Sequence, residues 1–391
     1  MIEIKPQIFW TGKIDWDIKF FHGHEFSTQE GTSYNSYLIK DELNVLVDTV
    51  WYPYKEEFKK NLENEIAGLD AIIVNHMEPD HGGSLEIIMD VRPDLPIYCT
   101  KNGADIIKAH FHKDWDFRIV KTGDELKTGK YTLKFVEMQM IHWPDSMMTY
   151  VDGAKLLLSN DAFGQHFAPG GLFDDVNDID VVMREAIKYY VNILTPLSGI
   201  IKKKLEQVLA LSLDIDMIAP SHGVLWRSNV GAIIEKYQQW VEGVGDGSVC
   251  VIFETMYDST RQMAEAIASG LQEEGVKYKM FNVATTDRSD LLTEIFKSSG
   301  VIIGSCTVLN AALRETTSLL DDMKMLKFKP KFAGAFGSYG WSGESAKLIF
   351  EKLQGMGMNV VGEPYRVKFR PDETAIAELV EYGIGFAKGL K

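Results

Sequence analysis

Asn75-His-Met-Glu-Pro-Asp-His81 is the stretch that decides how the first part of this chain folds and what it holds. Two imidazoles, at positions 76 and 81, and two carboxylates, at positions 78 and 80, stand within six residues. So many nitrogen and oxygen ligands on one short segment are typical of a first-row metal site. The apolar segment 71–74 precedes them, so we expect the ligands to lie at the end of a strand, where sites are commonly built.

The order of the four ligands indicates which metal they bind. Glu78 places an oxygen ligand where a zinc enzyme of similar layout usually has a histidine. His76, Glu78 and Asp80 alternate, so an extended segment would project all three to one side. His81 follows Asp80 directly, and two neighbours that point apart would serve two different metals.

Three later residues extend this set, and each follows an apolar run: His142 after 138–141, Asp161 after 156–160 and His222 after 217–218. We expect each of the three to end a strand, as His76 does. A histidine taken alone is often a satisfied core or loop residue, and a lone Asp is more often a turn or cap residue. Together with the first run they predict seven nitrogen and oxygen ligands and no thiolate, a set that suits iron or manganese.

The remaining histidines have no such placement, and we expect most of them on the surface or behind the ligands. His24, in Phe21-His-Gly-His-Glu25, is the one that we expect to hydrogen-bond a ligand. Beyond the metal ligands we assign no catalytic residue.

Composition narrows the class of protein. At 391 residues, with 45% hydrophobic and 25% charged residues, the chain predicts two globular domains. A net charge of −15 disfavours nucleic acid as a partner. The three cysteines are far apart and form no Cys-x-x-Cys, which argues against iron–sulfur, rubredoxin-type and zinc-ribbon sites and against a disulfide framework. This usage fits a cytoplasmic protein. We find no signal peptide and no apolar run long enough for a membrane span.

The glycine-rich segment Gly243–Ser248 predicts a linker between domains at 1–245 and 249–391. The first domain alternates short strands and helices, with one helical pattern over 178–211, and predicts sheets flanked by helices. The second predicts a doubly wound α/β fold, with helices between five parallel strands at 249–253, 277–282, 300–304, 331–336 and 358–361.

Three loops of the second domain predict a mononucleotide site. The hydroxyl-rich loop 255–260 opens a helix and suits a phosphate, but it has neither a Walker lysine nor Gly-x-Gly-x-x-Gly. Alone, it is also explained as a helix N-cap cluster, and Trp341 alone as a core residue. Loops 304–310 and 337–343, at the ends of the third and fourth strands, favour the ligand instead. The predicted binding residues are Thr255, Met256, Tyr257, Asp258, Ser259, Thr260, Ser305, Thr307, Val308, Leu309, Asn310, Ser338, Tyr339, Gly340, Trp341, Ser342 and Gly343.

These motifs carry a family resemblance across essentially the whole chain. The first domain resembles the metallo-β-lactamase fold, an αββα sandwich, whose His-x-His-x-Asp-His motif has Glu78 here in place of its second histidine. That change resembles the flavodiiron proteins, also called A-type flavoproteins, and the second domain resembles flavodoxin, which binds FMN. The resemblance implies one iron at His76, Glu78 and His142, another at Asp80, His81 and His222, and Asp161 between them. Coordination by the residue matching His81 varies in the family.

The resemblance also implies an activity. Two irons and FMN together would reduce O2 to water and/or NO to N2O. Electrons would come from a donor such as rubredoxin or coenzyme F420, and a head-to-tail homodimer, or a dimer of such dimers, would bring the flavin of one subunit to the irons of the other.

Two alternatives stay open at this point. One is a zinc-dependent hydrolase of the metallo-β-lactamase fold with a flavodoxin-like appendage, against which Glu78 argues. The other is an electron carrier whose first domain is only a scaffold.

Overall fold

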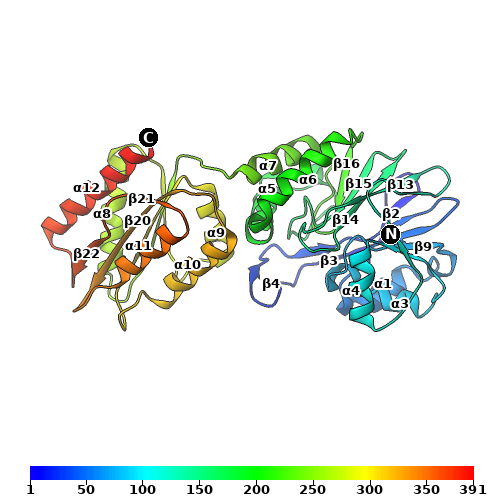
Figure 1. Ribbon diagram of the computed structural model, residues 1–391, viewed down its shortest axis with the longest axis horizontal. Helices are drawn as coiled ribbons and strands as arrows, with labels where there is room; N and C mark the ends of the chain where they lie inside the picture. Colours follow the sequence, from blue (N-terminus) through cyan, green and yellow to red (C-terminus); the bar gives the residue numbers. More distant parts are fainter. The chain divides into compact units, whose positions relative to one another are not determined.

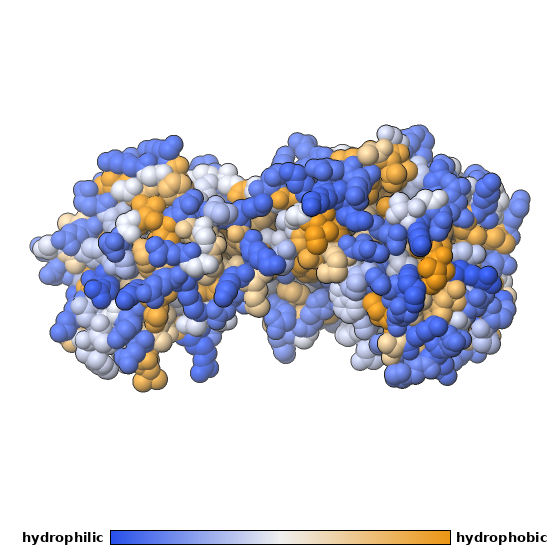
Figure 2. Space-filling model, in the orientation of Figure 1, coloured by the Kyte–Doolittle hydropathy of each residue, from blue (hydrophilic) through white to orange (hydrophobic).

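The computed structural model describes all 391 residues, which form two compact units, Met1–Val241 and Glu242–Lys391 (Figure 1). Helix α7 (Val230–Glu242) runs to the division, and the glycine-rich segment 243–248 belongs to the second unit. The predicted domain ranges 1–245 and 249–391 stay a prediction. Hydrophilic residues dominate the face of both units drawn in Figure 2. None of the helices combines the length and apolarity needed to cross a bilayer.

The first unit contains two packed sheets. The strands of the seven-stranded sheet are, in order across the sheet, β1 (Ile2–Lys5), β2 (Ile8–Trp10), β7 (Tyr37–Ile39), β8 (Val45–Val47), β9 (Ala71–Ile73), β10 (Ile97–Cys99) and β11 (Phe117–Ile119). The strands of the five-stranded sheet are, in order, β12 (Glu125–Lys127), β13 (Thr132–Glu137), β14 (Met147–Asp152), β15 (Leu156–Asn160) and β16 (Met217–Pro220). Two short hairpin-like pairs stand apart: β3 (Lys13–Asp15) with β6 (Thr32–Tyr34), and β4 (Phe20–Phe21) with β5 (Phe26–Ser27).

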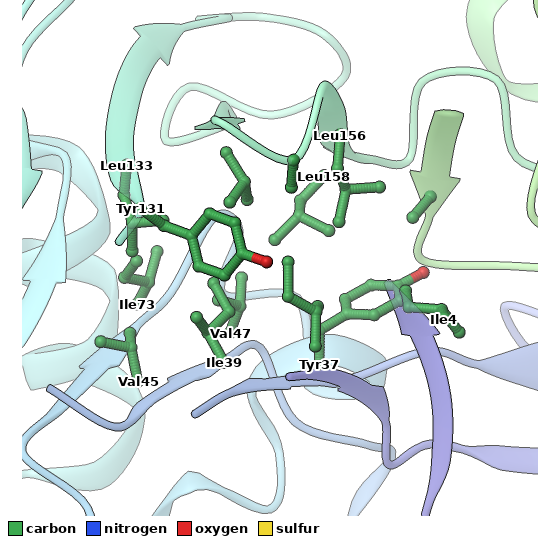
Figure 3. Close-up of a cluster of buried hydrophobic side chains, with 14 of the residues drawn as sticks. Ile4, Tyr37, Ile39, Val45, Val47, Ile73, Tyr131, Leu133, Leu156 and Leu158 are labelled. Carbon is green, nitrogen blue, oxygen red and sulfur yellow. The ribbon is translucent and has the colours of Figure 1, made fainter. Parts of the chain in front are cut away.

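Side-chain alternation explains why these strands stack as a sandwich. Val45 and Val47 point into the core between the sheets, together with Leu156 and Leu158 of the other sheet (Figure 3). Leu46 points the opposite way, into a second core beneath the helices. Because both faces of β8 are buried, its sequence is apolar at every position rather than at every second one.

Helices cover both outer faces of the sandwich (Figure 1). On one side lie α1 (Lys55–Asn61), α3 (Leu85–Met89) and α4 (Lys101–Phe111), and on the other α5 (Ile179–Tyr189), α6 (Ser198–Ala210) and α7. The single helical turn α2 (Pro79–Gly82) follows β9. The predicted helix over 178–211 is therefore interrupted: a π-helical turn, Tyr190–Leu194, and a 3-10 turn around Pro196 separate α5 from α6. Pro196 cannot donate a helical hydrogen bond, which accounts for the 3-10 turn that contains it. The layers form the expected αββα sandwich.

The second unit has one sheet in which every strand is parallel to its neighbours. The order is β18 (Tyr278–Asn282), β17 (Val249–Glu254), β19 (Gly300–Ser305), β20 (Phe332–Tyr339) and β21 (Asn359–Val360), and β22 (Tyr365–Lys368) pairs with the later part of β20. The flavodoxin-like fold is confirmed, but the fifth edge position is shared between two short strands, and sequence patterning predicted only the first.

Helices cover both faces of this sheet (Figure 1): α8 (Ser259–Glu273) and α12 (Glu373–Leu390) on one, and α9 (Arg288–Lys297), α10 (Arg314–Leu326) and α11 (Ser345–Gly355) on the other. Gly270 and Gly383 let α8 and α12 approach closely, since a Cβ at Gly383 would lie 2.2 Å from the carbonyl oxygen of Ile267.

Two expectations about the ligand segments are wrong. The stretch 138–141 is a turn rather than a strand, because β13 ends at Glu137 and Met140 has a φ of 64°. The run 76–80 is not extended throughout either. Pro79 is pre-organised for the first turn of a helix and opens α2, which carries Asp80 and His81.

Candidate metal and flavin sites

Asp161 stands at the centre of the ligand cluster, directly after β15, and is 1% exposed. Its Oδ2 atom faces Nε2 of His76 at 3.7 Å and Nε2 of His142 at 3.3 Å. Its Oδ1 atom faces Nε2 of His81 at 3.0 Å and Nε2 of His222 at 3.6 Å. The two oxygens of one carboxylate are therefore divided between two pairs of imidazoles, as a ligand shared by two ions requires.

Glu78 completes the first half of the cluster. Its Oε2 atom lies 3.2 Å from Nε2 of His76 and 3.3 Å from Nε2 of His142. Two ligands that are each about 2.1 Å from one ion are about 3.0–3.4 Å apart at tetrahedral or octahedral angles. The spacing of these donor atoms fits an ion at their centre.

Asp80 completes the second half. Its Oδ2 atom lies 3.1 Å from Nε2 of His222, and its Oδ1 atom lies 3.4 Å from Nε2 of His81. Asp80 and His81 thus do not point to separate ions, because the helical turn of α2 turns both toward Asp161. The structure brings all seven predicted ligands together.

Several ligand atoms of the cluster are buried without the hydrogen bonds that would stabilise them. Oδ1 of Asp80, Nε2 of His81 and Oδ2 of Asp161 are buried and form no well-aligned hydrogen bond, although each faces another ligand atom of the cluster. Leaving buried polar atoms unpaired costs about 1–3 kcal/mol each. A cation at each half of the cluster satisfies them, and an all-nitrogen-and-oxygen set with three carboxylates suits iron or manganese.

The second unit contains a cleft of about 420 Å³ at the carboxyl ends of its strands, a size typical of a small-molecule site. Segments at the ends of β17, β19 and β20 form most of its wall. Eleven of the predicted residues line it: Thr255, Met256, Tyr257, Ser259, Thr307, Val308, Leu309, Ser338, Tyr339, Gly340 and Trp341. Trp341 is 89% exposed, so the interpretation of this residue as core is wrong.

Six predicted residues do not line the cleft: Asp258, Thr260, Ser305, Asn310, Ser342 and Gly343. Thr260 is buried and hydrogen-bonds Ser338 at 2.9 Å, so it supports the wall from behind. The cleft also includes Cys306 and Phe369, which the sequence analysis missed. Cys306 lies within a loop already singled out, whereas Phe369 follows β22, a strand that was not predicted.

Comparison with known proteins matches residues 32–223 to the ODP family beta lactamase and residues 251–383 to flavodoxin. Over 393 aligned residues, 99% of this chain and 82% of the relative, the chain is 44% identical to the anaerobic nitric oxide reductase flavorubredoxin of Escherichia coli (strain K12 / DH10B). The flavodiiron protein from Giardia intestinalis is 32% identical, with a TM-score of 0.94 over 99% of this chain and 96% of that one. The chain belongs to the flavodiiron protein family.

A second solved relative of this flavodiiron protein is the rubredoxin oxygen:oxidoreductase of Desulfovibrio gigas. The two are 33% identical, and the TM-score is 0.95 over 100% of this chain and 98% of the other. The likeness therefore spans both units of the flavodiiron chain.

Groups behind the ligands fix how the imidazoles of this flavodiiron protein point. Nδ1 of His76 lies 3.0 Å from Asp145, and Nδ1 of His222 lies 2.7 Å from the carbonyl oxygen of Ser33. Each Nδ1 donates its proton there, which leaves Nε2 directed at the cluster. Asp145 also accepts the backbone N–H of Met77 at 2.8 Å. Sequence reasoning did not assign these roles.

His22, not His24, reaches the cluster. Nε2 of His22 lies 2.7 Å from Oε1 of Glu78, the oxygen that faces away from His76 and His142. His24 is exposed, and its ring packs on Phe20 with centroids 5.0 Å apart. The expectation for His24 is therefore corrected. The two histidines stand two positions apart in one turn between β4 and β5, and only its path in space distinguishes them.

The buried charges of the cluster shift the pKa values of its members. Burial lowers the pKa of His81, but the charges of Asp80 and Asp161 outweigh this effect and raise that pKa to about 9. Burial also lowers the pKa of His142, while Asp161 and Glu78 raise it to about 9. In Asp161, burial raises the pKa, yet the neighbouring imidazolium charges bring it well below its usual range. Asp161 therefore stays ionised and attracts positive charge, either as protons on the imidazoles or as a metal ion that displaces them.

Proposed function

We propose that this flavodiiron protein reduces O2 to water and/or NO to N2O, with two irons held by His76, Glu78, Asp80, His81, His142, Asp161 and His222 and with FMN held in the cleft of the second unit. It is an oxidoreductase with FMN and two irons per chain as cofactors. The single observation that carries the proposal is Asp161, whose two oxygens each face a different pair of imidazoles.

The electron count supports these substrates. When bound, FMN accepts electrons in ones or twos and a pair of irons stores two, so together they supply the four that reduce O2 to two waters. Reducing two NO molecules to N2O and water needs only two. The E. coli relative is named as a nitric oxide reductase and the D. gigas relative as an oxygen oxidoreductase, so the names of the relatives support both NO and O2 as substrates.

The chain's own residues do three things in this scheme. The seven ligands bind and separate the two metal positions, and Asp145 and the carbonyl oxygen of Ser33 orient the imidazoles of His76 and His222. His22, whose side chain is 32% exposed, places Nε2 beside Glu78 at the edge of the cluster that solvent reaches. There it contacts the Glu78 carboxylate and orients it.

Electron delivery requires partners. We propose rubredoxin or coenzyme F420 as donor, and the names of both relatives favour rubredoxin. The rim of the cleft exposes large apolar side chains, with Tyr257 86% and Leu309 93% exposed. Such a rim suits a protein surface that covers the flavin. We propose that a second copy of the chain provides it in a head-to-tail homodimer or in a dimer of such dimers.

We propose a cytoplasmic location because the three cysteines are free thiols. Cys99, Cys250 and Cys306 form no disulfide, as expected of a protein that works in the reducing cytoplasm.

The decisive experiment is anaerobic stopped flow. Iron and FMN are counted per chain, the protein is reduced, and it is mixed with O2 or with NO while flavin absorbance is followed. We expect reoxidation by at least one gas, with water or N2O as product. Zinc in place of iron, together with turnover of an ester or nucleic-acid substrate, would contradict the proposal and favour a hydrolase.

A further inference from the structure

An apolar cavity of about 160 Å³ lies in the first unit, apart from the metal ligands. Leu157 of β15 and Ile218 of β16 form its floor, and Leu205 of α6 and Ile234 of α7 cover it. Among the residues that line it, only Ser212 has a polar side chain. The proposed function does not involve this space.

The cavity leads from solvent into the unit. Leu209, at its mouth, is 46% exposed. Met138, Met148 and Phe163, which also line it, are each no more than 3% exposed. The exposure of the lining residues therefore falls from the surface to the interior, and none of these residues is charged.

The inner wall belongs to the loops that hold the first half of the metal cluster. Phe163 stands two residues after Asp161. The carbonyl oxygen of Met138 accepts the N–H of Ile141 at 2.9 Å, immediately before His142. Nε2 of His142 and Oδ2 of Asp161 are 3.3 Å apart. Two ligands of one half of the cluster thus stand on the segments that close the cavity.

Phe163 is held rigidly at this inner end. Its φ of 68° is unfavourable for a bulky residue and persists only where the surroundings determine it. Its N–H donates to the hydroxyl of Tyr237 at 2.9 Å, and its carbonyl oxygen accepts Nε1–H of Trp226 at 2.8 Å. Its ring also packs on Tyr237 with centroids 4.6 Å apart. These contacts position Phe163 at the inner end of the cavity, two residues from Asp161.

The apolar lining of the cavity favours small uncharged molecules. An engineered protein cavity of about 150 Å³ lined by Leu, Ile and Phe stays dry and binds benzene or xenon. Ions and polar molecules lose hydration in such a space without gaining partners. A small uncharged diatomic molecule loses little hydration free energy on entry and is small enough to fit the cavity.

We infer that this cavity takes up O2 or NO from solvent and delivers it toward the His142 and Asp161 side of the metal cluster. The inference rests on the proposed function, because that function supplies the diatomic substrate. It adds a binding site and an entry route for that substrate.

Xenon tests the site without using activity. Crystals of the holoenzyme are pressurised with xenon, and anomalous scattering locates bound atoms. We expect xenon between Phe163 and Leu209 in the wild type. In Val208→Phe, the larger side chain fills the cavity and xenon is lost. Ile200→Phe is the matched control, since Ile200 is on the same helix, is 38% exposed and does not line the cavity. A wild-type cavity without xenon overturns the inference.

Stopped flow tests delivery. Val208→Phe is expected to lower the second-order rate constant for reaction of the reduced protein with gas by about threefold or more, while reduction by the electron donor is unchanged. Equal rate constants for Val208→Phe and Ile200→Phe overturn the delivery route even if xenon binds. Should Val208→Phe fold poorly, Leu213→Phe fills the same space. A wild type that binds xenon but reduces neither gas points to failure of the proposed function instead.

Discussion

Nε2 of His22 lies 2.7 Å from Oε1 of Glu78, while the other oxygen of Glu78 faces His76 and His142. One carboxylate therefore joins the metal cluster to a histidine of the turn between β4 and β5. A group that hydrogen-bonds a metal ligand orients it and tunes its basicity.

Replacement of His22 tests this link. We expect His22→Ala to lower turnover with O2 or NO by about tenfold or more, because loss of such a partner typically costs 10–100-fold in activity or metal affinity. His22→Gln, which retains a donor, should recover part of the loss. His24→Ala is the control and should behave as wild type, since His24 packs only on Phe20. Equal losses in the His22 and His24 variants would contradict the assignment.

Asp161→Asn tests the shared ligand. The substitution keeps the shape of the side chain but removes the charge that faces both pairs of imidazoles. We expect iron to fall from two per chain to about one or fewer, because a neutral amide is a poor bridging ligand for a hard cation. Asp175→Asn, at an exposed carboxylate paired with Arg227, should leave the iron count unchanged. Elemental analysis of freshly purified protein provides the count.

The ligands illustrate what a sequence reveals and what it does not. Asp161 and His222 were predictable because each comes after a run of apolar residues that forms a buried strand, β15 or β16. The helical turn at Pro79 had a local signal, proline at the first helical position, which alternation of the ligands obscured. The role of His22 had none, because it depends on a contact with Glu78 across 56 positions of chain.

The flavin cleft teaches the same lesson. Its three main loops follow apolar strands and carry small and hydroxyl side chains, so the sequence predicts them. Phe369 was missed because β22 is only four residues long and half of its side chains are exposed, which leaves too weak a pattern to detect. Short edge strands form through pairing with a neighbour, here β20, and not through their own periodicity.

Trp341→Ala tests the flavin assignment. The side chain is 89% exposed and lines the cleft, so its loss should leave the fold intact and remove a surface on which a flat ring stacks. Stacking of aromatic rings contributes about 0.5–1.5 kcal/mol, so the dissociation constant for FMN should rise by about tenfold or less. Fluorescence titration of the apoprotein with FMN measures it. Trp16→Ala, at an exposed tryptophan of the first unit, should leave the constant unchanged.

Gly383→Ala tests how closely α8 and α12 pack. The new Cβ would lie 2.2 Å from the carbonyl oxygen of Ile267, so the helices must separate. We expect the free energy of unfolding of the second unit to fall by about 1–3 kcal/mol or more, the usual cost of overpacking. Gly385→Ala, in the same helix with open space around it, should raise that free energy, by about 1 kcal/mol or less. Urea unfolding of both variants, monitored by pulse proteolysis, measures the two free energies of unfolding.

Lys331 offers a test of pH dependence. It is 6% exposed, and its Nζ donates to the carbonyl oxygens of Val244 and Phe296, both at 2.9 Å, and to that of Ser298. The ammonium thus ties the segment after α7 to the rest of the second unit. Lys331→Met leaves these carbonyls without their donor and should cost about 1–3 kcal/mol at neutral pH.

The difference between wild type and Lys331→Met should grow as pH rises above about 8. Burial lowers the pKa of Lys331 to about 8. Between that pH and about 10.4, the usual lysine pKa, the unfolded chain binds more protons than the folded one, so wild-type stability rises with pH. Below pH 8 both states are protonated, and the burial cost is fully present. Pulse proteolysis in urea at several pH values measures the difference, with Lys329→Met, at an exposed lysine, as control. A difference that stays constant across this range, or shrinks, would show that the ammonium is not destabilised by burial.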